Sequence, residues 1–416
     1  MKPKIMLFTA LFGITVMAVQ GQLLKESSLP VSVLSSEDIF KQGVWNFNLN
    51  ELISLQAGNT REDGVKTGTF SNLDGNIEAN YFFIDHFGAG AGIGFTQDVT
   101  RVTEFDPEAL EKINVLDGHF NFLYGNNIGG VVNIITKANV GLGSYTTIND
   151  FGYGEYETKY NYFKTGVSVG TPIEINRNVY FTPSAGYSYI RYKNDDFKEV
   201  CHGFNLELNM DFFMGCGDDM CDLSDNPLSL DSRFIQGDMV LGSRMFGNFQ
   251  VGKQTTTYQG EGEVTQNDGF GNSRLSGYFL YYVMNNLAIG AGTDFSCNRT
   301  NSKDTEYKTK QSEATFYPVV RYNLPFDNML KNIYTEGSFG FGFNNSKTED
   351  GSGEVTDNAS VINWRLGAGY TYFVSEHFSL SPVFGYGSQT LKYKNDDLKA
   401  ANGGIYAGVG WNFHLR

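Results

Sequence analysis

Residues 405–416 read Ile-Tyr-Ala-Gly-Val-Gly-Trp-Asn-Phe-His-Leu-Arg, so that apolar residues alternate with glycine, polar residues and one tyrosine. Because successive side chains of a β-strand point to opposite faces, this stretch predicts a strand with one apolar face. Similar alternation runs through residues 73–83, 204–212 and 362–370. In each case the second face is polar or rich in glycine, which is typical of a sheet that separates two different environments.

The length of these alternating stretches distinguishes between two all-β architectures. Strands of soluble proteins average about five or six residues, and the stretches here are roughly twice as long. A transmembrane barrel needs such strands because its outer face meets lipid while its inner face meets water or packed polar groups. We therefore expect an all-β fold, a transmembrane antiparallel β-barrel, in preference to a soluble β-sandwich.

The composition of the 416-residue chain agrees with a membrane barrel. It contains 34 Phe, 24 Tyr and 49 Gly, and its charged fraction of 19% excludes a coiled coil or a disordered chain. The mean hydropathy of −0.28 resembles that of a soluble protein, but a barrel with a polar interior gives similar values. The net charge of −15 argues against a nucleic acid partner, because phosphate binding needs a basic face.

The first 21 residues have the features of a secretory signal peptide. Lys2 and Lys4 form a basic start, and an apolar stretch runs from Ile5 to Val19. This stretch is shorter than the roughly 20 residues that a membrane helix needs. We expect export through the periplasm to the outer membrane of a Gram-negative bacterium.

Short and long connections alternate along the chain. Short turns are expected at Asp85-His86, at Asn285-Asn286 and at 375–377, and long polar loops at 59–69 and 344–360. Short turns at one end of a barrel and long loops at the other are typical of outer-membrane proteins.

The two halves of the chain are related by a shift of about 200 residues, which indicates two copies of one structural unit. Residues 87–95 match residues 287–295, and the motif Tyr-Lys-Asn-Asp-Asp at 192–196 recurs at 393–397. Each half resembles the eight-stranded outer-membrane β-barrel domains of Bacteroidota, which implies two such domains in tandem. This resemblance implies an outer-membrane location and no shared enzymatic activity.

Two closures are compatible with this pattern. About 16 strands can form one barrel with an aqueous channel, or eight can close twice to give two tandem barrels filled by side chains. We favour one barrel, because both sets of strands continue the same up-and-down alternation.

Two shorter stretches resemble the plug domain of TonB-dependent receptors. Residues 29–39 are similar to the opening strand of the plug, and residues 105–137, which include Leu123-Tyr124-Gly125, to its closing segment. The chain is too short for a complete receptor of this kind, whose barrel has about 22 strands. The resemblance implies plug-derived strands or a small lumen insert, and it adds TonB as an alternative partner.

The expected organisation contains one cysteine-bearing linker. Cys216 and Cys221 lie in it and are expected to form a disulfide in an oxidising periplasm. The segments are a signal peptide at 1–21, a plug-like segment at 22–43, a first barrel repeat at 44–213, an acidic linker at 214–235 and a second barrel repeat at 236–416.

Charged residues on the polar strand faces are the candidate functional residues. Acidic residues outnumber basic ones, so a water-filled lumen would favour cations. These expected lumen-facing residues are Asp74, Glu78, Glu207, Asp211, Asp294, Arg365 and Arg416. The five histidines show no metal-ligand spacing, and no catalytic motif is present, so we expect no catalytic residue, no metal and no cofactor.

The last strand resembles the C-terminal sorting signal of outer-membrane barrels, through Ile405, Val409, Trp411 and Phe413. The expected partners are therefore the barrel assembly machinery, outer-membrane lipid and lipopolysaccharide. We expect a non-enzymatic barrel, either a porin-like passive channel for small solutes or a structural surface protein. The alternative is a transport or binding protein related to TonB-dependent receptors.

Overall fold

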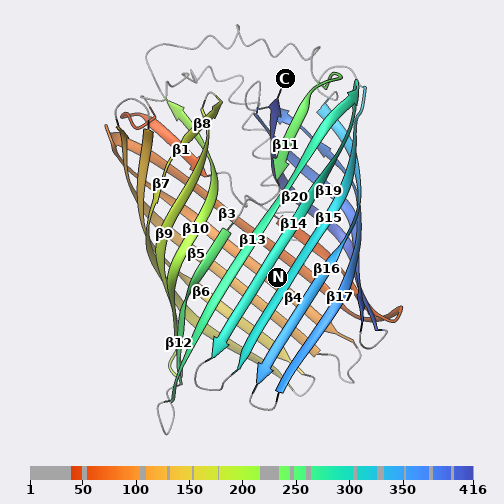
Figure 1. Cartoon of the computed structure of the whole chain (residues 1–416). Coiled ribbons are helices and arrows are strands. Elements are labelled where there is room, and N and C mark those ends of the chain that lie inside the picture. Colours follow the sequence, from red (N-terminus) through yellow and green to blue (C-terminus); the bar gives the residue numbers. More distant parts are fainter. Residues whose placement is uncertain are drawn as a thin grey trace.

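The computed structural model describes residues 39–48, 54–103, 109–128, 132–151, 154–176, 178–215, 234–243, 248–258, 264–302, 307–325, 332–350, 353–373, 378–394 and 398–415. In this part of the chain the strands join into one antiparallel sheet that closes on itself (Figure 1). Among the described residues, no helix is long and apolar enough to cross a bilayer.

Twenty strand segments build this sheet. The first half contains β1 (Val44–Asn48), β2 (Ser54–Glu62), β3 (Val65–Ile84), β4 (Phe87–Val102), β5 (Ala109–Ile128), β6 (Val132–Asp150), β7 (Glu155–Gly170), β8 (Ile173–Asn176), β9 (Val179–Lys193) and β10 (Phe197–Gly215). The second half contains β11 (Met239–Ser243), β12 (Asn248–Tyr258), β13 (Val264–Met284), β14 (Leu287–Ser302), β15 (Lys308–Asn323), β16 (Ile333–Asp350), β17 (Gly353–Tyr370), β18 (Tyr372–Phe373), β19 (Phe378–Tyr393) and β20 (Lys399–Leu415).

One end of the molecule is a single ring. There, β2 pairs with β3 on one side and with β20 on the other, while β12 pairs with β10 and with β13. The β2–β20 pair joins the two ends of the strand order, and the β10–β12 pair joins the two halves. The strands close as one 16-stranded antiparallel barrel, which confirms the fold expected from the sequence. We call this end the wide end.

At the opposite end the same strands form two smaller rings. β1 pairs with β3 and β10, which closes the first half on itself. β11 pairs with β13 and β20, which closes the second half in the same way. We call these rings the first lobe (β1 and β3–β10) and the second lobe (β11 and β13–β20); they separate at the upper end of Figure 1. Both closures that the pattern allows are therefore present, one at each end.

The two lobes contact each other through apolar side chains on their outer faces. Val179 and Met210 come from the first lobe, Phe378 and Trp411 from the second, and each is at most 5% exposed. Phe413 packs against the same cluster. The apolar face of the C-terminal strand is therefore covered by the neighbouring lobe at this end, because two rings lie side by side there.

An apolar belt surrounds the outside of the barrel. Outward side chains such as Phe120, Leu142, Phe204 and Leu366 are more than 60% exposed, which a barrel in water would not favour. A closed barrel satisfies its backbone hydrogen bonds internally, and with an apolar outer face it can cross a membrane. The protein is an outer-membrane β-barrel, as expected.

The expected connections are only partly correct. The tight turns at Asp85-His86 and Asn285-Asn286 are present. The turn expected at 375–377 lies outside the described residues. The long loops expected at 59–69 and 344–360 are wrong, because the described residues of both stretches extend the β2–β3 and β16–β17 hairpins. Their apolar alternation fades because these strand ends lie beyond the apolar belt, where both faces meet water.

The stretch that resembles a plug segment lies in the barrel wall. Residues 110–128 belong to β5 and residues 132–137 to β6, which pair with each other and with their neighbours β4 and β7. The described residues of this stretch therefore form strands, and a lumen insert is wrong for them. Residues 29–39 resemble the opening of the plug, and of these only Ile39 lies within the described residues. Residues 1–38, which include the expected signal peptide, lie outside them.

A short segment closes the base of each lobe. The sequences Phe40-Lys-Gln-Gly43 and Phe234-Ile-Gln-Gly237 precede β1 and β11. Gly43 and Gly237 have φ of 92° and 100°, a left-handed conformation that glycine adopts without a Cβ clash. Gly43 N–H donates to the Phe82 carbonyl at 2.8 Å, and Gly237 N–H donates to that of Tyr282 at 2.9 Å. The two halves therefore place equivalent aromatic side chains at the base of each lobe.

Candidate functional site

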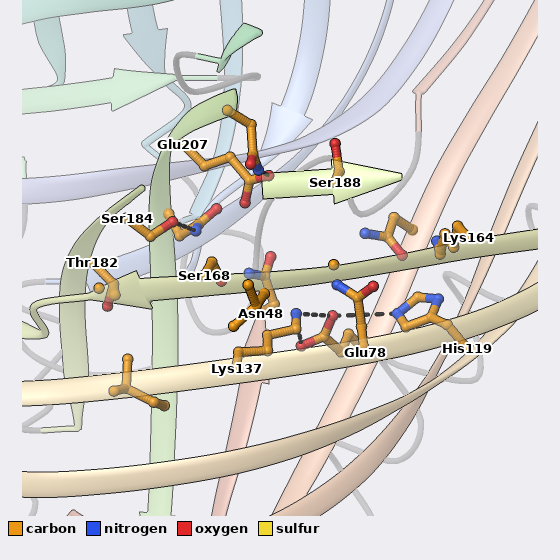
Figure 2. Close-up of a pocket in the computed structure, with 18 of the residues that line it drawn as sticks. Asn48, Glu78, His119, Lys137, Lys164, Ser168, Thr182, Ser184, Ser188 and Glu207 are labelled. Atoms are coloured by element: carbon orange, nitrogen blue, oxygen red, sulfur yellow. Dashed lines mark hydrogen bonds and ion pairs between the residues drawn. The ribbon is translucent and has the colours of Figure 1, made fainter. Parts of the chain in front are cut away.

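A cavity of about 370 Å³ lies where the 16-stranded lumen narrows into the first lobe (Figure 2). Strands of the first lobe supply most of its lining, and Gln250 of β12 contributes from the wide ring. Much of the lining is polar, including Asn48, Ser168, Ser184 and Glu207. A pocket of several hundred Å³ with convergent polar groups is the usual form of a small-molecule site. We call this cavity the first-lobe pocket.

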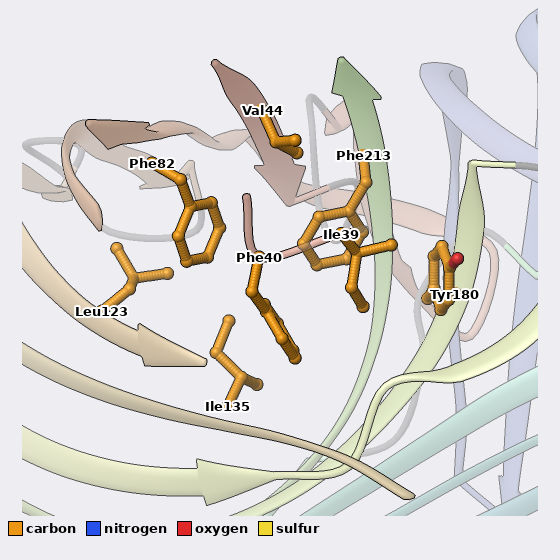
Figure 3. Packing of buried hydrophobic residues seen from close by; sticks show 8 residues of the cluster. All are labelled: Ile39, Phe40, Val44, Phe82, Leu123, Ile135, Tyr180 and Phe213. Atoms are coloured by element: carbon orange, nitrogen blue, oxygen red, sulfur yellow. The ribbon is translucent and has the colours of Figure 1, made fainter. Parts of the chain in front are cut away.

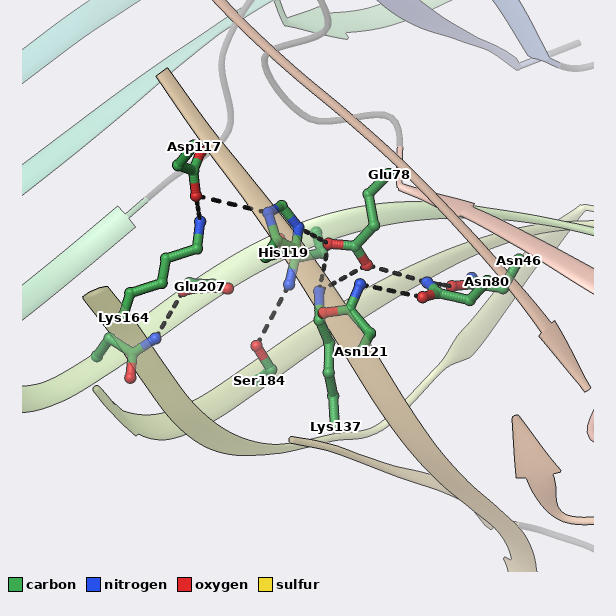
Figure 4. Close-up of polar contacts among 12 residues, drawn as sticks. Asn46, Glu78, Asn80, Asp117, His119, Asn121, Lys137, Lys164, Ser184 and Glu207 are labelled. Carbon is green, nitrogen blue, oxygen red and sulfur yellow. Dashed lines mark hydrogen bonds and ion pairs between the residues drawn. The ribbon is translucent and has the colours of Figure 1, made fainter. Parts of the chain in front are cut away.

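A layer of ion pairs crosses the lobe beside the pocket (Figure 4). Lys137 Nζ lies 2.5 Å from Glu78 Oε2, and Lys164 pairs with Asp117. His119 lies between the two carboxylates, with Nε2 3.4 Å from Glu78 and Nδ1 3.6 Å from Asp117. These side chains come from β3, β5, β6 and β7, whose alternating residues point into the lobe. The layer therefore couples four neighbouring strands.

Amide side chains extend this layer across the lobe. Asn121 Nδ2 donates to Asn80 Oδ1 at 3.1 Å, and Asn80 Nδ2 donates to Asn46 Oδ1 at 3.0 Å and to Glu78 Oε1 at 2.9 Å. Asn46 belongs to β1, so the chain of bonds reaches the strand that closes the lobe. Such connected buried polar groups fix a side-chain arrangement, because leaving one without its partner is costly.

An apolar cluster forms the floor of the pocket (Figure 3). Leu123 and Ile135 line the pocket and also belong to this cluster. Ile39 and Phe40, which precede β1, are 0% and 2% exposed within it. The cluster members are Ile39, Phe40, Val44, Phe82, Leu123, Ile135, Tyr180 and Phe213. We call this set the base cluster. It separates the pocket from the end of the first lobe that lies opposite the wide end.

Two carboxylates of β10 line the pocket without an ion pair to any described residue. Glu207 accepts a hydrogen bond from Asn205 Nδ2 at 2.6 Å. Asp211 is 7% exposed and lies near Thr182 and Asn46. Both residues are among those expected in the lumen, and both line the pocket.

An aromatic wall rises from the pocket toward the wide end. Tyr162 lines the pocket, and its ring centroid lies 5.2 Å from that of Tyr192. Tyr192 contacts Tyr145 at 5.3 Å, and Tyr145 contacts Tyr160 at 5.6 Å. A solute that enters from the wide end would pass these ring faces before it reached the carboxylates.

The second lobe is filled at the corresponding level. Arg321 is 2% exposed; its Nη2 lies 2.5 Å from Glu336 Oε2 and donates to Tyr278 Oη at 3.0 Å. Its guanidinium also lies 4.3 Å from the ring centroid of Tyr334. The cavity beside Tyr278 and Glu336 measures only about 20 Å³. This cavity is therefore too small for a solute of the size that the first-lobe pocket can hold.

Three further predicted lumen residues, Asp74, Asp294 and Arg365, also lie on inner faces. Asp294 Oδ2 lies 3.6 Å from Arg365 Nη2, and Asp74 shares a face of β3 with Glu78. Their effect on ion selectivity stays a prediction. Arg416, Cys216 and Cys221 lie outside the described residues, and among the described residues no group of three or more His, Cys, Asp or Glu is arranged to hold a metal.

Sequence reasoning missed the basic half of the ion-pair layer. Lys137 and Lys164 were not placed in the lumen, and neither were Asp117 and His119. The signal was available in residues 116–121, where apolar residues and glycine alternate with Asp117, His119 and Asn121. The resemblance of this region to a plug segment obscured its strand pattern.

Comparison with known proteins gives only weak structural likenesses. No protein-family model matches the chain, and no curated protein matches it. Similar solved structures include a bacterial polysaccharide outer membrane secretin (10% identity, 91% of this chain and 100% of that chain, TM-score 0.33). They also include the outer membrane protein opdK from Pseudomonas aeruginosa (8%, 89% and 99%, 0.29) and the P. putida toluene transporter TodX (8%, 93% and 96%, 0.28). At these TM-scores the likeness supports no inference about function.

Proposed function

We propose that the protein is a gated outer-membrane channel that admits small polar solutes at its wide end and binds them in the first-lobe pocket. The observation that carries this proposal is the position of the pocket, at the point where sixteen strands divide into two rings of eight. A solute that diffuses down the wide lumen reaches this narrowing, and the polar lining offers it hydrogen-bond partners.

The lobes explain why we propose a gate instead of an open pore. An eight-stranded barrel is just wide enough for its own side chains to fill, whereas a 16-stranded barrel leaves an aqueous lumen. The base cluster fills the first lobe below the pocket, and the Arg321 network fills the second. Passage beyond the pocket requires the base cluster and the adjacent ion-pair layer to move.

The same proposal covers the surroundings of the barrel. Outer-membrane lipid and lipopolysaccharide would contact the apolar belt, and the barrel assembly machinery would receive the C-terminal strand. We derive the two halves from one duplicated eight-stranded unit, because both carry the Phe-x-Gln-Gly segment and the same closing strand pairs. The described residues that resemble a plug segment form strands of the barrel wall. For this reason the proposal does not include transport energised through TonB.

Binding of solutes of one size tests the site. Glucose, glucosamine and glucuronate are titrated calorimetrically into the refolded protein in detergent micelles. We expect at least one to bind, and Ser168→Trp, which fills the pocket, to abolish that binding. Thr158→Trp is the matched control, because Thr158 lies on the same face of β7 nearer the wide end and outside the pocket. Unchanged binding by Ser168→Trp, or no binding by the wild type, would contradict the proposal.

Conductance in a planar bilayer tests the gate. We expect folded wild-type protein to show no large steady current, because both lobes are filled. Removing the aromatic side chain from the base cluster by Phe40→Ala should produce current steps or raise their frequency. A large steady conductance of the wild type would show that the lobes do not close the barrel.

A further inference from the structure

The charges of the first-lobe pocket do not balance. Its lysines are both engaged, because Lys137 pairs with Glu78 and Lys164 pairs with Asp117. Both lysines line the pocket with side chains that are 25% and 24% exposed, and the carboxylate partner of each offsets its positive charge. Glu207 and Asp211 are left as carboxylates with no ion pair to a described residue.

Two buried amide oxygens of lining residues also lack a hydrogen-bond donor within the described part of the chain. Asn205 uses its Nδ2 to donate to Glu207, and its buried Oδ1 has no partner among the described residues. Asn76 Oδ1 is likewise buried without one, and both residues line the pocket. A carboxylate only accepts hydrogen bonds, so the vacant capacity of these groups is that of acceptors. The group that complements them is a donor with a positive charge.

We infer that the first-lobe pocket selects small polar solutes that carry a primary ammonium group. An ammonium has three donors and no acceptor, which matches a carboxylate without an ion pair, either Glu207 or the deeper Asp211. The hydroxyl and amide side chains of the lining would contact the neutral part of the solute. This inference rests on the proposed function, because it names the class of solute that the pocket would take.

The two carboxylates lie at different depths. Four residues of β10 separate them, which is about 13 Å at 3.3 Å per residue. Asp211 pairs across the sheet with Asn48 of β1, near the base, whereas Glu207 pairs with Asn248 of β12, at the division of the lobes. A cationic solute would therefore meet Glu207 first and Asp211 deeper in the lobe. The Tyr162 ring beside this path adds an aromatic face, which attracts cations.

The test compares three solutes that share one sugar ring and differ in the group at one carbon, of which one is cationic and two are neutral. Glucosamine carries an ammonium, glucose has a hydroxyl in its place, and N-acetylglucosamine has a neutral amide. We expect glucosamine to bind the refolded protein at least tenfold more tightly than either, measured by calorimetry at low ionic strength. The preference should fall as salt is raised, because salt screens the charges.

Conservative variants locate the source of the preference. Glu207→Gln and Asp211→Asn each keep the side-chain shape, and each should lower the preference for glucosamine several-fold, with the double variant removing it. Asp98→Asn, which removes a carboxylate of β4 outside the pocket lining, should leave it unchanged. Should Asp211→Asn fail to give the compact, heat-modifiable band of a folded barrel, Glu207→Gln alone decides.

The outcomes separate this inference from the proposed function. If glucose or N-acetylglucosamine binds as tightly as glucosamine, the ammonium preference is overturned while the binding site stands. A preference that survives in the Glu207→Gln and Asp211→Asn variants also overturns it. If none of the solutes binds, the proposed function itself fails.

Discussion

Replacing Phe40 by alanine should destabilise the first lobe more than any exposed aromatic replacement. Phe40 is 2% exposed, and its ring centroid lies 5.7 Å from that of Phe82 and 6.3 Å from that of Phe213. Removal of a fully buried Phe side chain costs about 3–5 kcal/mol, because the transfer free energy is lost and a cavity is left. The base cluster is enclosed by strands of a closed ring, so it can collapse little, and we expect the upper half of that range.

The assay is reversible urea unfolding in micelles, followed by tryptophan fluorescence. Trp45 of β1 lies 4.9 Å from Tyr81 between ring centroids and reports on the closure of the first lobe. Phe151→Ala is the matched control, because Phe151 is 58% exposed and lies at the wide end, and a change within about 0.5 kcal/mol is expected for a surface site. A loss below about 1 kcal/mol for Phe40→Ala would refute the reasoning, because the base of the lobe could not then be a packed cluster.

Three further predictions concern the lobes. Gly43→Ala and Gly237→Ala should each lower the free energy of unfolding by about 1–2 kcal/mol in the same urea assay, since both glycines have positive φ; no loss at either would contradict the left-handed geometry. Glu78→Gln should destabilise by about 3 kcal/mol, because it leaves the half-buried Lys137 without its carboxylate, and Glu78→Gln with Lys137→Met should recover most of that loss. Trp411→Ala should cost about 3 kcal/mol or more through the contact between lobes, and a loss under 1 kcal/mol would show that the lobes are not packed together.

The barrel itself was predictable from the sequence because its physical cause is local. Lipid on one side and polar groups on the other impose a period of two, and residues 405–416 and 204–212 display it directly. The inward positions of Glu78, Glu207 and Asp211 follow from the same period. The division into two lobes could not be predicted, because it depends on which distant strand lies beside β1 and β11. The sequence of a short segment such as Val44–Asn48 does not indicate which strands it pairs with, because the many strands of the barrel share the same alternating pattern.

The ion-pair layer was only partly predictable for a similar reason. Strand period places a carboxylate on an inner face, but the distance to a lysine depends on register between strands. Lys137 meets Glu78 although 59 residues separate them, and the intervening strand β5 contributes His119 to the same contact. Counting acids and bases along one strand therefore overstates the free negative charge of a lumen. Glu78 and Asp294 illustrate this, since each lies beside a basic residue.

At one level the two lobes are packed with different side chains, and there the described cavities measure about 370 Å³ in the first lobe and about 20 Å³ in the second. His119 faces Gly92 across the sheet in the first lobe, and Tyr317 faces Gly292 at the equivalent place in the second. Leu123 of β5 pairs with Lys137 of β6 in the first lobe. At the equivalent place in the second lobe, Arg321 of β15 pairs with Glu336 of β16. A lysine reaches its partner with a thin alkyl chain, whereas a guanidinium packed on tyrosine rings fills the cross-section. The second lobe is therefore filled at this level, and the first retains the cavity and the carboxylates without a described ion pair that the proposed solute would contact.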